Sequence, residues 1–405
     1  MNHTKIVLVG ASMRIKAFVY ALLKDYADTH ELCAVMDVDD GKMRGFNETL
    51  KIDLPRYTDF EKMCDEIRPD LVLISTVDYF HRDYILKSLD RKISCISEKP
   101  LCVNIEQCRD ILAAQKRNPE VFAATSHNAR YHVAARAVKR LLDEDAIGKV
   151  NSVHYAEMLD LEHGASYFRR WNRVKKLSGG LQIHKSSHHF DKLNWWLNSR
   201  VASLTASGGL KVYGSNASPF HGENCSSCPH TSRCRFAVDY KKDTCIDFSI
   251  FTKYRAENSY IPDKCVFSPE IDIEDFLSVG LNYENGVCVN YTLAAHCNYE
   301  GEDIIFEGER GRIEMKRRIY REEKALRKDS VKVYHFKNSE PENIEFASET
   351  GGHGGADARL FEDLFGNKKS GRLATLQDGV QAVLIGIAVN EALKTGSKIN
   401  VQSLL

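Results

Sequence analysis

Short apolar runs alternate with amphipathic stretches along the first hundred residues of the chain. The apolar runs cover residues 6–9, 32–36, 71–75 and 94–97. Such runs, without polar alternation, are typical of strands buried on both faces of a parallel sheet. Residues 15–26 and 59–67 carry apolar side chains at helical spacing, and Asp59 is a candidate N-cap. The pattern predicts an α/β fold that begins with βαβ units.

Polar or small residues follow each apolar run. Ligands of open parallel sheets bind beyond the carboxyl ends of the strands, where the strand order reverses. The residues expected at this crevice are Gly10, Asp37, Ser75, Thr76 and the tripeptide Glu98-Lys99-Pro100. The sequence therefore predicts one binding crevice formed by several strand ends.

The first strand leads into the turn Gly10-Ala11-Ser12-Met13-Arg14, which keeps only the first glycine of G-x-G-x-x-G. Small residues here let backbone N–H groups approach a pyrophosphate at the start of a helix. An ordinary βα turn is the alternative. Asp37 ends the second strand, where a carboxylate accepts both ribose hydroxyls and repels a 2′-phosphate. We therefore expect NAD rather than NADP.

Composition excludes several classes of partner. The 405 residues have a net charge of zero and are 43% hydrophobic, so a nucleic-acid partner is not expected. No apolar run reaches the ~18 residues of a membrane helix, and the first strand begins too early for a signal peptide. We expect a cytoplasmic protein that does not bind membranes.

Further motifs follow in a characteristic order. They are residues 76–81 after the third run, Glu98-Lys99-Pro100, Asn128-Ala129-Arg130-Tyr131, a helical stretch over 133–142, and the segment 179–191 that contains two glycines and three histidines. In this order they resemble the glucose-fructose oxidoreductase / inositol dehydrogenase / rhizopine-catabolism (Gfo/Idh/MocA) family.

The resemblance implies two domains. Residues 1–127 would form an NAD-binding Rossmann domain, and residues 128–405 a substrate-binding and oligomerisation domain on an open, mainly antiparallel sheet. Strand-like residues 276–283 and 286–294 fit that second sheet. A homodimer or homotetramer is expected by the same analogy.

The resemblance also implies hydride transfer between nicotinamide and a hydroxyl carbon of a sugar, sugar derivative or cyclitol. Lys99 and His188 match the family's catalytic pair, and Asp191, three residues after His188, could orient its imidazole. The expected cofactor contacts are Gly10, Ala11, Ser12, Met13, Arg14, Asp37, Ser75, Thr76, His81, Glu98, Lys99 and Asn128. The expected substrate contacts are Lys99, Arg170, Trp171, His184 and His188.

Three candidate positions have competing interpretations. His184 replaces the aspartate that the family commonly has four residues before its histidine, and it serves substrate binding, a structural hydrogen bond or a divalent metal. Arg170 either bonds substrate hydroxyls or pairs with a surface acid. His353, in the glycine-rich residues 351–357, either reaches the crevice or forms the turn before a helix over 358–365.

A cysteine-rich insertion spans about residues 214–246. Cys225, Cys228, Cys234 and Cys245 could close a tetrahedral structural zinc site, which would order a loop with no core of its own. Free thiols, an iron–sulfur cluster or a redox pair are the alternatives.

Three functional classes follow. The first is an NAD-dependent sugar or cyclitol dehydrogenase, and the second a glycoside-cleaving enzyme that uses NAD in a transient oxidation and elimination cycle. The third is a regulator that binds a nucleotide without catalysis, which the presence of both Lys99 and His188 argues against.

Overall fold

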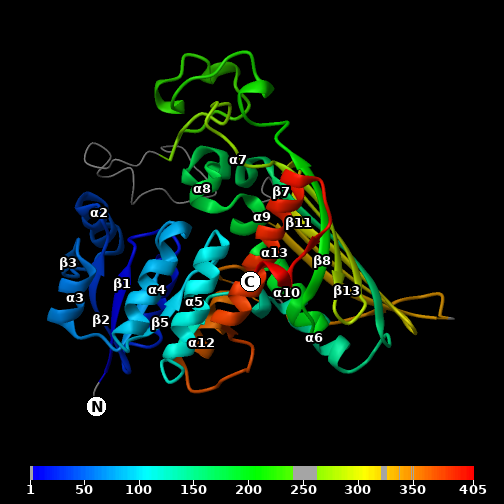
Figure 1. Cartoon of the computed structure of the whole chain (residues 1–405), viewed down its shortest axis with the longest axis horizontal. Helices are drawn as coiled ribbons and strands as arrows, with labels where there is room; N and C mark the ends of the chain where they lie inside the picture. The colour runs from blue at the N-terminus through cyan, green and yellow to red at the C-terminus, as the bar shows by residue number, and fades with distance from the viewer. Residues whose placement is uncertain (1–2, 240–261, 321–325, 337, 348, 350) are drawn as a thin grey trace.

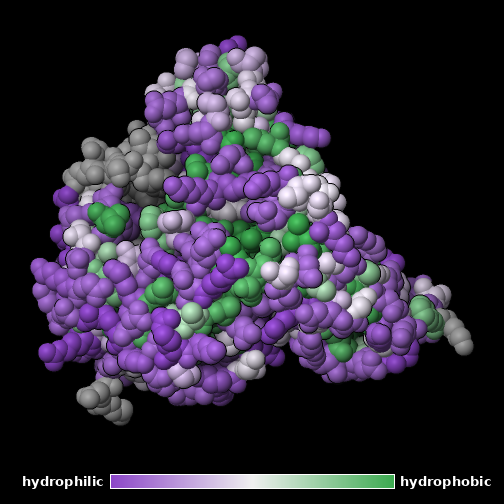
Figure 2. All heavy atoms as spheres, in the orientation of Figure 1, coloured by the Kyte–Doolittle hydropathy of each residue, from purple (hydrophilic) through white to green (hydrophobic). Residues whose placement is uncertain are grey.

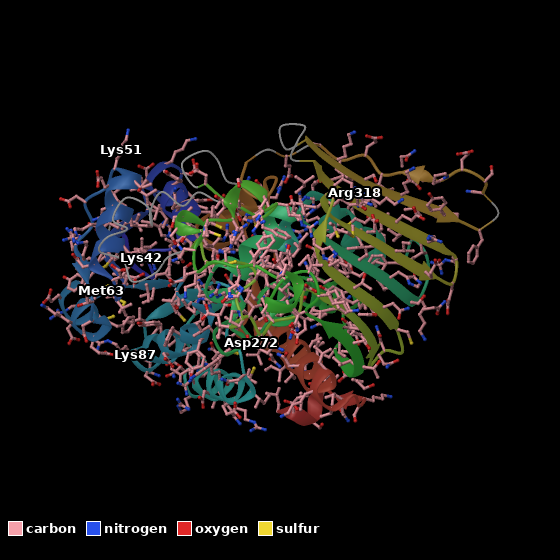
Figure 3. All side chains as sticks on the ribbon, turned by 90° about the horizontal axis from the view of Figure 1, so that it is seen from above. Lys42, Lys51, Met63, Lys87, Asp272 and Arg318 are labelled. Atoms are coloured by element: carbon pink, nitrogen blue, oxygen red, sulfur yellow. The ribbon has the colours of Figure 1, made fainter. Side chains whose placement is uncertain are left out.

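The chain forms two sheets joined by a central layer of helices (Figure 1). The computed structural model describes all residues except 1–2, 240–261, 321–325, 337, 348 and 350. Seen from above, the first sheet and Lys42 lie toward one end of the molecule, and the second sheet and Arg318 toward the other (Figure 3). The binding crevice lies between the two halves.

The first sheet has the order β15-β6-β5-β4-β1-β2-β3 in the described residues, and all its strands are parallel except the edge strand β15, which pairs antiparallel with β6. Its strands are β1 (Thr4–Val9), β2 (His30–Met36), β3 (Arg56–Tyr57), β4 (Leu71–Ile74), β5 (Ser94–Ser97), β6 (Ala123–Thr125) and β15 (Ala374–Thr375). The order reverses beside β1, as predicted for a crevice at its carboxyl end.

Helices cover both faces of this sheet. They are α1 (Ile15–Lys24), α2 (Asp40–Leu50), α3 (Phe60–Ile67), α4 (His81–Asp90) and α5 (Ile105–Arg117). The Asp59 side chain accepts a hydrogen bond from the Lys62 N–H and caps α3, as the sequence predicted. The first predicted helix ends two residues early, at Lys24.

The second sheet is mainly antiparallel, with order β14-β13-β12-β11-β7-β10-β9-β8-β16 among the described residues; β7 and β10 alone pair in parallel there. Its strands are β7 (Val150–Asp160), β8 (Val201–Gly209), β9 (Phe276–Tyr283), β10 (Cys288–Cys297), β11 (Glu300–Gly308), β12 (Gly311–Tyr320), β13 (Leu326–His335), β14 (Glu342–Asn343) and β16 (Ile399–Asn400). The strand predicted from residue 286 begins at Cys288, because Gly286 has φ +89° and forms the hairpin turn.

The central helices are α6 (Val133–Asp143), α7 (Leu161–Arg169), α8 (Lys175–Ser178), α9 (Leu181–His184), α10 (Ser187–Leu197), α12 (Ala356–Phe365) and α13 (Leu376–Thr395). Residues 181–197 form two helices, α9 and α10, with a break between His184 and Ser187. The Ser186 N–H and hydroxyl both donate to the Leu181 carbonyl and interrupt the helix there.

The C-terminal part of the chain returns to the first sheet. Strand β15 pairs with β6, and α12 packs its Phe361 ring 4.7 Å from Phe18 of α1. Helix α13 is buried on most sides and contributes to the cores of both halves. The domain boundary at residues 127/128 stays a prediction. None of the described helices is long and apolar enough to cross a membrane.

Candidate active site

A cavity of about 700 Å³ lies between the ends of β1, β4 and β5 and the helices α7, α9 and α10. The predicted residues that line it are Ser12, Met13, Arg14, Ser75, Thr76, His81, Glu98, Lys99, Asn128, Arg170, Trp171, His184, His188 and His353. Strand ends and helices far apart in sequence therefore meet at one site, as expected.

The turn after β1 has the geometry of a phosphate-binding turn. Gly10 has φ +97°, and a Cβ atom there would lie 2.4 Å from the Ser75 carbonyl oxygen, so only glycine fits. The Ser12 hydroxyl is 2.6 Å from the Ser75 hydroxyl and accepts from the Ile15 N–H at 3.3 Å. The turn thus brings backbone and a helix N-terminus close to the cavity, which fits a dinucleotide pyrophosphate.

Asp37 lies at the end of β2, where a ribose would bind. It accepts from the backbone N–H groups of Ala11 at 2.9 Å and Asp39 at 3.2 Å, and from Lys42 Nζ at 2.6 Å. The buried carboxylate fits ribose hydroxyls. The Lys42 charge weakens its repulsion of a 2′-phosphate, so the preference for NAD stays a prediction.

The Arg14 side chain forms ion pairs with two carboxylates, although the sequence predicted it as a cofactor contact. Its Nε lies 2.9 Å from Glu98, and its two terminal nitrogens each donate to Asp357 at 2.9 Å. Asn128 also donates to Asp357, and His353 Nδ1 lies 2.8 Å from it. Burial opposes the charge on Asp357, but His353 and Arg14 hold its pKa well below the usual value. Sequence analysis missed Asp357 as the centre of this network.

His353 therefore combines both predicted interpretations. It lines the cavity, and it lies in the turn before α12, which begins at Ala356 rather than Ala358.

His81 binds backbone rather than pointing a free nitrogen at the cavity. Its Nδ1 lies 2.7 Å from the Pro100 carbonyl oxygen and its Nε2 3.2 Å from that of Thr76. Its ring joins the ends of β4 and β5 and so positions Lys99.

Lys99 donates to the His184 carbonyl oxygen at 2.8 Å. Burial lowers the pKa of Lys99 to about 8, although Asp78 and Glu98 oppose this shift. No carboxylate lies in ion-pair contact with Lys99 within the described part of the chain. An amine in this state can exchange a proton near neutral pH.

His188 is the second residue of α10 and lies in its first turn. Burial, and then the charge of Lys99, hold its pKa well below the usual value, so its imidazole is neutral. Its Nδ1 is buried without a hydrogen-bond partner among the described residues, and its ring meets His127 edge to face at 5.7 Å. A buried polar atom in this state fits a ligand with a hydroxyl group.

The expected role of Asp191 is wrong. Its two oxygens accept from Arg130 at 2.7 and 2.6 Å, so it anchors α10 instead of orienting His188.

His184 is held at both ring nitrogens. Nδ1 lies 2.5 Å from Asp78 Oδ2, and Nε2 3.1 Å from Asn172 Nδ2. Burial lowers the pKa of His184 and raises that of Asp78, and the charge of Lys99 opposes the shift on Asp78. This geometry favours the structural interpretation of His184, which positions Lys99 through its carbonyl. The spacing of His184 and His188 also no longer indicates a metal, since the helix is broken between them.

Arg170 reaches the cavity without an acidic partner among the described residues. Its guanidinium donates to the carbonyl and hydroxyl of Ser166 at 3.0 and 3.2 Å and lies 5.6 Å from the Tyr167 ring centre. The Trp171 ring meets His184 edge to face. The surface-acid alternative for Arg170 is thus not observed among the described residues, and its guanidinium lies beside the Tyr167 ring at the cavity.

Two models of one family match the chain. The "Oxidoreductase family, NAD-binding Rossmann fold" model (GFO_IDH_MocA) matches residues 4–126, and its "C-terminal alpha/beta domain" model matches residues 139–401. The chain belongs to the Gfo/Idh/MocA oxidoreductase family. Its first sheet is therefore an NAD-binding Rossmann domain, and the family prediction is confirmed.

A full-length relative of this oxidoreductase is known in Bacillus subtilis. It is named "Putative oxidoreductase YteT" and is 31% identical, with 96% of this chain and 94% of the relative aligned. A 2,7-anhydro-N-acetylneuraminate hydratase of Mediterraneibacter gnavus is 22% identical over 44% of this chain and 46% of its own length.

Solved structures share the fold of this oxidoreductase. A levoglucosan dehydrogenase in complex with NADH and levoglucosan aligns with a TM-score of 0.70, 15% identity, and 99% and 100% of the two chains covered. A myo-inositol 2-dehydrogenase of Lactobacillus plantarum aligns with a TM-score of 0.64, 13% identity, and 98% and 99% covered. These likenesses confirm the predicted fold class.

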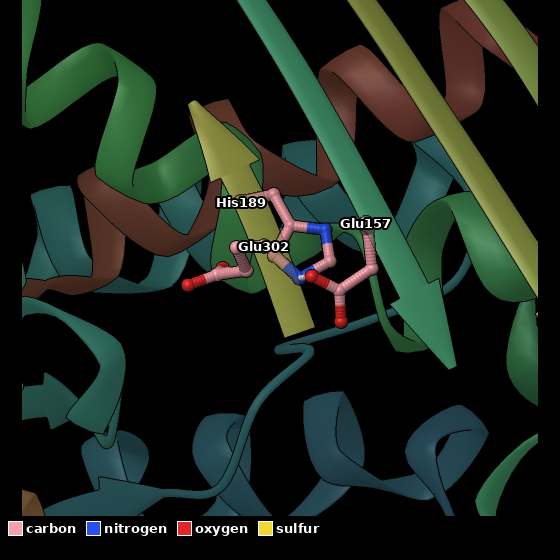
Figure 4. Close-up of side chains that lie close together, drawn as sticks. All are labelled: Glu157, His189 and Glu302. Carbon is pink, nitrogen blue, oxygen red and sulfur yellow. Dashed lines mark ion pairs between the residues drawn. The ribbon is translucent and has the colours of Figure 1, made fainter. Parts of the chain in front are cut away.

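A buried cluster of charges forms part of the cavity wall in this oxidoreductase (Figure 4). The atoms of Glu157, His189 and Glu302 lie within 4.8 Å of one another, as in a metal site. Three cations already contact the two carboxylates: Lys185 lies 3.0 Å from Glu157, Arg317 3.5 Å from Glu302, and Lys192 also pairs with Glu302. A further divalent cation would meet repulsion, so this cluster is an ion-pair network that fixes α10 to the sheet.

Three of the four predicted zinc ligands lie in the described residues. Cys225, Cys228 and Cys234 lie together in the insertion, whereas Cys245 lies outside the described residues.

Proposed function

We propose that this oxidoreductase is an NAD-dependent dehydrogenase that oxidises a hydroxyl carbon of a sugar, sugar derivative or cyclitol. The observation that carries the proposal is the pairing of Lys99 and the neutral His188 at one cavity, beyond the ends of the Rossmann strands. Support for a carbohydrate also comes from the fold likeness to levoglucosan and inositol dehydrogenases.

A hydroxyl carbon gives up hydride readily only as its O–H proton leaves. The lowered pKa of Lys99, about 8, makes its neutral amine the better proton acceptor of the pair. His188 is neutral and holds a free ring nitrogen, so it binds and orients the same oxygen. We therefore assign the role of base to Lys99 rather than to His188.

NAD, when bound, supplies the hydride acceptor. Gly10, Ala11, Ser12 and the start of α1 would hold its pyrophosphate, and Asp37 its ribose. Arg170 and Trp171 would bind the substrate, with the guanidinium donating to oxygen atoms and the aromatic rings covering C–H groups. His184 and His81 position Lys99.

The test measures NADH formation by the purified full chain with NAD and a panel of free sugars, sugar acids and inositols. Lys99→Met should abolish turnover and leave NAD affinity intact, whereas Lys87→Met, a half-exposed lysine on α4, should retain both. Loss of NAD binding in Lys99→Met would contradict the assigned role, and no NADH with any polyol would contradict the dehydrogenase.

The second candidate is redox-neutral cleavage of a glycosidic bond through transient oxidation and elimination. Two observations favour it: the Asp78–His184 pair adds a proton-carrying group beside Lys99, and a partial relative is a hydratase. This enzyme would retain tightly bound NAD through dialysis and release sugar from glycosides with no net NADH. One assay of NADH formation and sugar release therefore separates the two candidates. The dehydrogenase forms NADH from a free sugar, whereas the glycoside-cleaving enzyme releases sugar without net NADH.

We further propose a cytoplasmic homodimer or homotetramer. The cysteines in the described residues are unpaired, which suits a reducing compartment. One face of β10 is largely exposed at alternate residues, which leaves a sheet face available to another subunit. Light scattering on the purified protein measures the subunit number, and a monomer would contradict the proposal.

A further inference from the structure

The cysteine-rich segment projects from the second domain as an irregular loop, at the top of Figure 1. No side chain between residues 215 and 235 is buried, and its surface is mainly hydrophilic to intermediate in Figure 2. The loop lacks the apolar burial that offsets the entropy of ordering a chain. An interaction other than apolar burial must therefore order this loop.

Four cysteines line one small cavity at the base of this loop. They are Cys225, Cys228, Cys234 and Cys265, and the cavity measures about 20 Å³. A volume of this size holds about one water-sized particle. It therefore suits a single ion better than a cubane iron–sulfur cluster.

Backbone pairing explains how Cys265, which lies 31 residues after Cys234 in the sequence, reaches the site. Asn224 and Lys264 form an antiparallel bridge, the Cys225 N–H donates to the Asp263 carbonyl at 2.8 Å, and the Cys265 N–H donates to the Glu223 carbonyl at 2.9 Å. In such a pair, the diagonal neighbours Cys225 and Cys265 share one face. Their sulfurs are thus directed to the same side of the bridge.

Two donors stabilise negative charge on the sulfurs. The His230 N–H donates to Cys228 Sγ at 3.4 Å, and Arg169 donates to Cys225 Sγ at 3.2 Å. The Arg169 guanidinium is buried and also donates to the Phe236 carbonyl, and it meets no carboxylate among the described residues. A buried cation without an acid requires another anion nearby, and thiolates supply it.

We propose that Cys225, Cys228, Cys234 and Cys265 bind one structural zinc ion. Four thiolates around Zn²⁺ carry a net negative charge that Arg169 partly offsets. In the described residues, only Glu157, His189 and Glu302 bring three possible ligand atoms within 4.8 Å of one another. The four cysteine sulfurs are therefore farther apart than the ligand atoms of a metal-bound site. The thiolates therefore draw together on binding, with Cys265 as the fourth ligand.

The ion would also brace the substrate cavity. Arg169 ends α7 and contacts the cysteines, whereas its neighbour Arg170 lines the cavity. Loss of zinc would release α7 at this end and displace Arg170. Substrate affinity should then fall more than the rate at saturating substrate.

The test measures zinc, iron and acid-labile sulfide in the purified full chain by plasma mass spectrometry and colorimetry. We expect about one zinc per chain in the wild type and in the control variants Cys245→Ser and Cys288→Ser, and loss of zinc in Cys265→Ser. Zinc retained by Cys265→Ser, zinc lost from Cys245→Ser, iron with sulfide, or no metal at all would each overturn the assignment.

A second measurement decides the question if Cys265→Ser fails to fold. Chelation of the wild type followed by addition of Co²⁺ should give the absorption bands of tetrahedral thiolate cobalt, with restored thermal stability. Zn²⁺ should then displace the cobalt and bleach the bands. A spectrum of octahedral aqueous cobalt would overturn the proposal.

Discussion

The pH dependence of sugar oxidation tests the assignment of Lys99 as proton acceptor. Burial lowers the pKa of Lys99 to about 8. About a tenth of the amine is then neutral at about pH 7 and about nine-tenths at about pH 9. Because His188 has a pKa well below its usual value, it stays neutral across this interval and adds no inflection. The rate should therefore rise roughly tenfold with pH.

The assay measures kcat/KM for the sugar at saturating NAD in buffers of constant ionic strength. The positive ring of bound NAD would move the inflection toward lower pH, since a like charge disfavours protonated Lys99. Asp78→Asn should move it further in that direction, because Asp78 raises the pKa of Lys99. Asp83→Asn, which removes a partly exposed carboxylate on α4, is the matched control and should leave the inflection in place.

A rate that falls with pH would refute this reasoning. It would mean that protonated Lys99 is the active form and stabilises an alkoxide, with the proton leaving to His188. A profile that is the same in the wild type and in Asp78→Asn would remove Asp78 from the electrostatic environment of Lys99.

Three further predictions concern single residues. His188→Ala should lower kcat by about 10²–10³-fold and leave the NAD dissociation constant, measured by calorimetry, unchanged. A change in NAD affinity as large as the change in kcat would contradict the placement of His188 at the substrate. Arg14→Met removes the ion-pair partner of Glu98 and one of the partners of Asp357, and should lower the free energy of unfolding by about 3 kcal/mol, the low end of the range for buried pairs because the Arg14 side chain is 23% exposed; urea denaturation measures it, and unaltered stability with weaker NAD binding would indicate a phosphate contact instead. Arg170→Ala should raise KM for the substrate about tenfold or more with little change in kcat, whereas a fall in kcat alone would place Arg170 at the reacting atoms.

The location of the site was predictable because it depends on local pattern. Apolar runs define the strands, and the parallel fold brings their carboxyl ends together without knowledge of any long-range contact. Lys99 therefore lines the cavity, and Gly10 and Asp37 directly follow the carboxyl ends of β1 and β2. The cap at Asp59 was likewise predictable, because it depends on the four consecutive residues 59–62.

Partners of charged residues were not predictable, because they come from distant segments. Arg14 pairs with Asp357, and Asp191 pairs with Arg130, across separations that periodicity does not describe. Helical spacing predicted that Asp191 lies near His188. In the structure the Asp191 carboxylate instead accepts two hydrogen bonds from the buried Arg130 guanidinium. Cys265 was missed for the same reason, since only the pairing of residues 224 and 264 brings it to the other cysteines.

The return of the C-terminal segment has a consequence for synthesis of the protein on the ribosome. The Rossmann sheet gains its edge strand β15 only after residue 375 has emerged, and α12 is needed to cover Phe18 of α1. During translation the nascent first domain thus exposes apolar surface until nearly the whole chain is made. We expect a fragment of residues 1–127 to aggregate, and chaperones to hold the growing chain through most of its elongation.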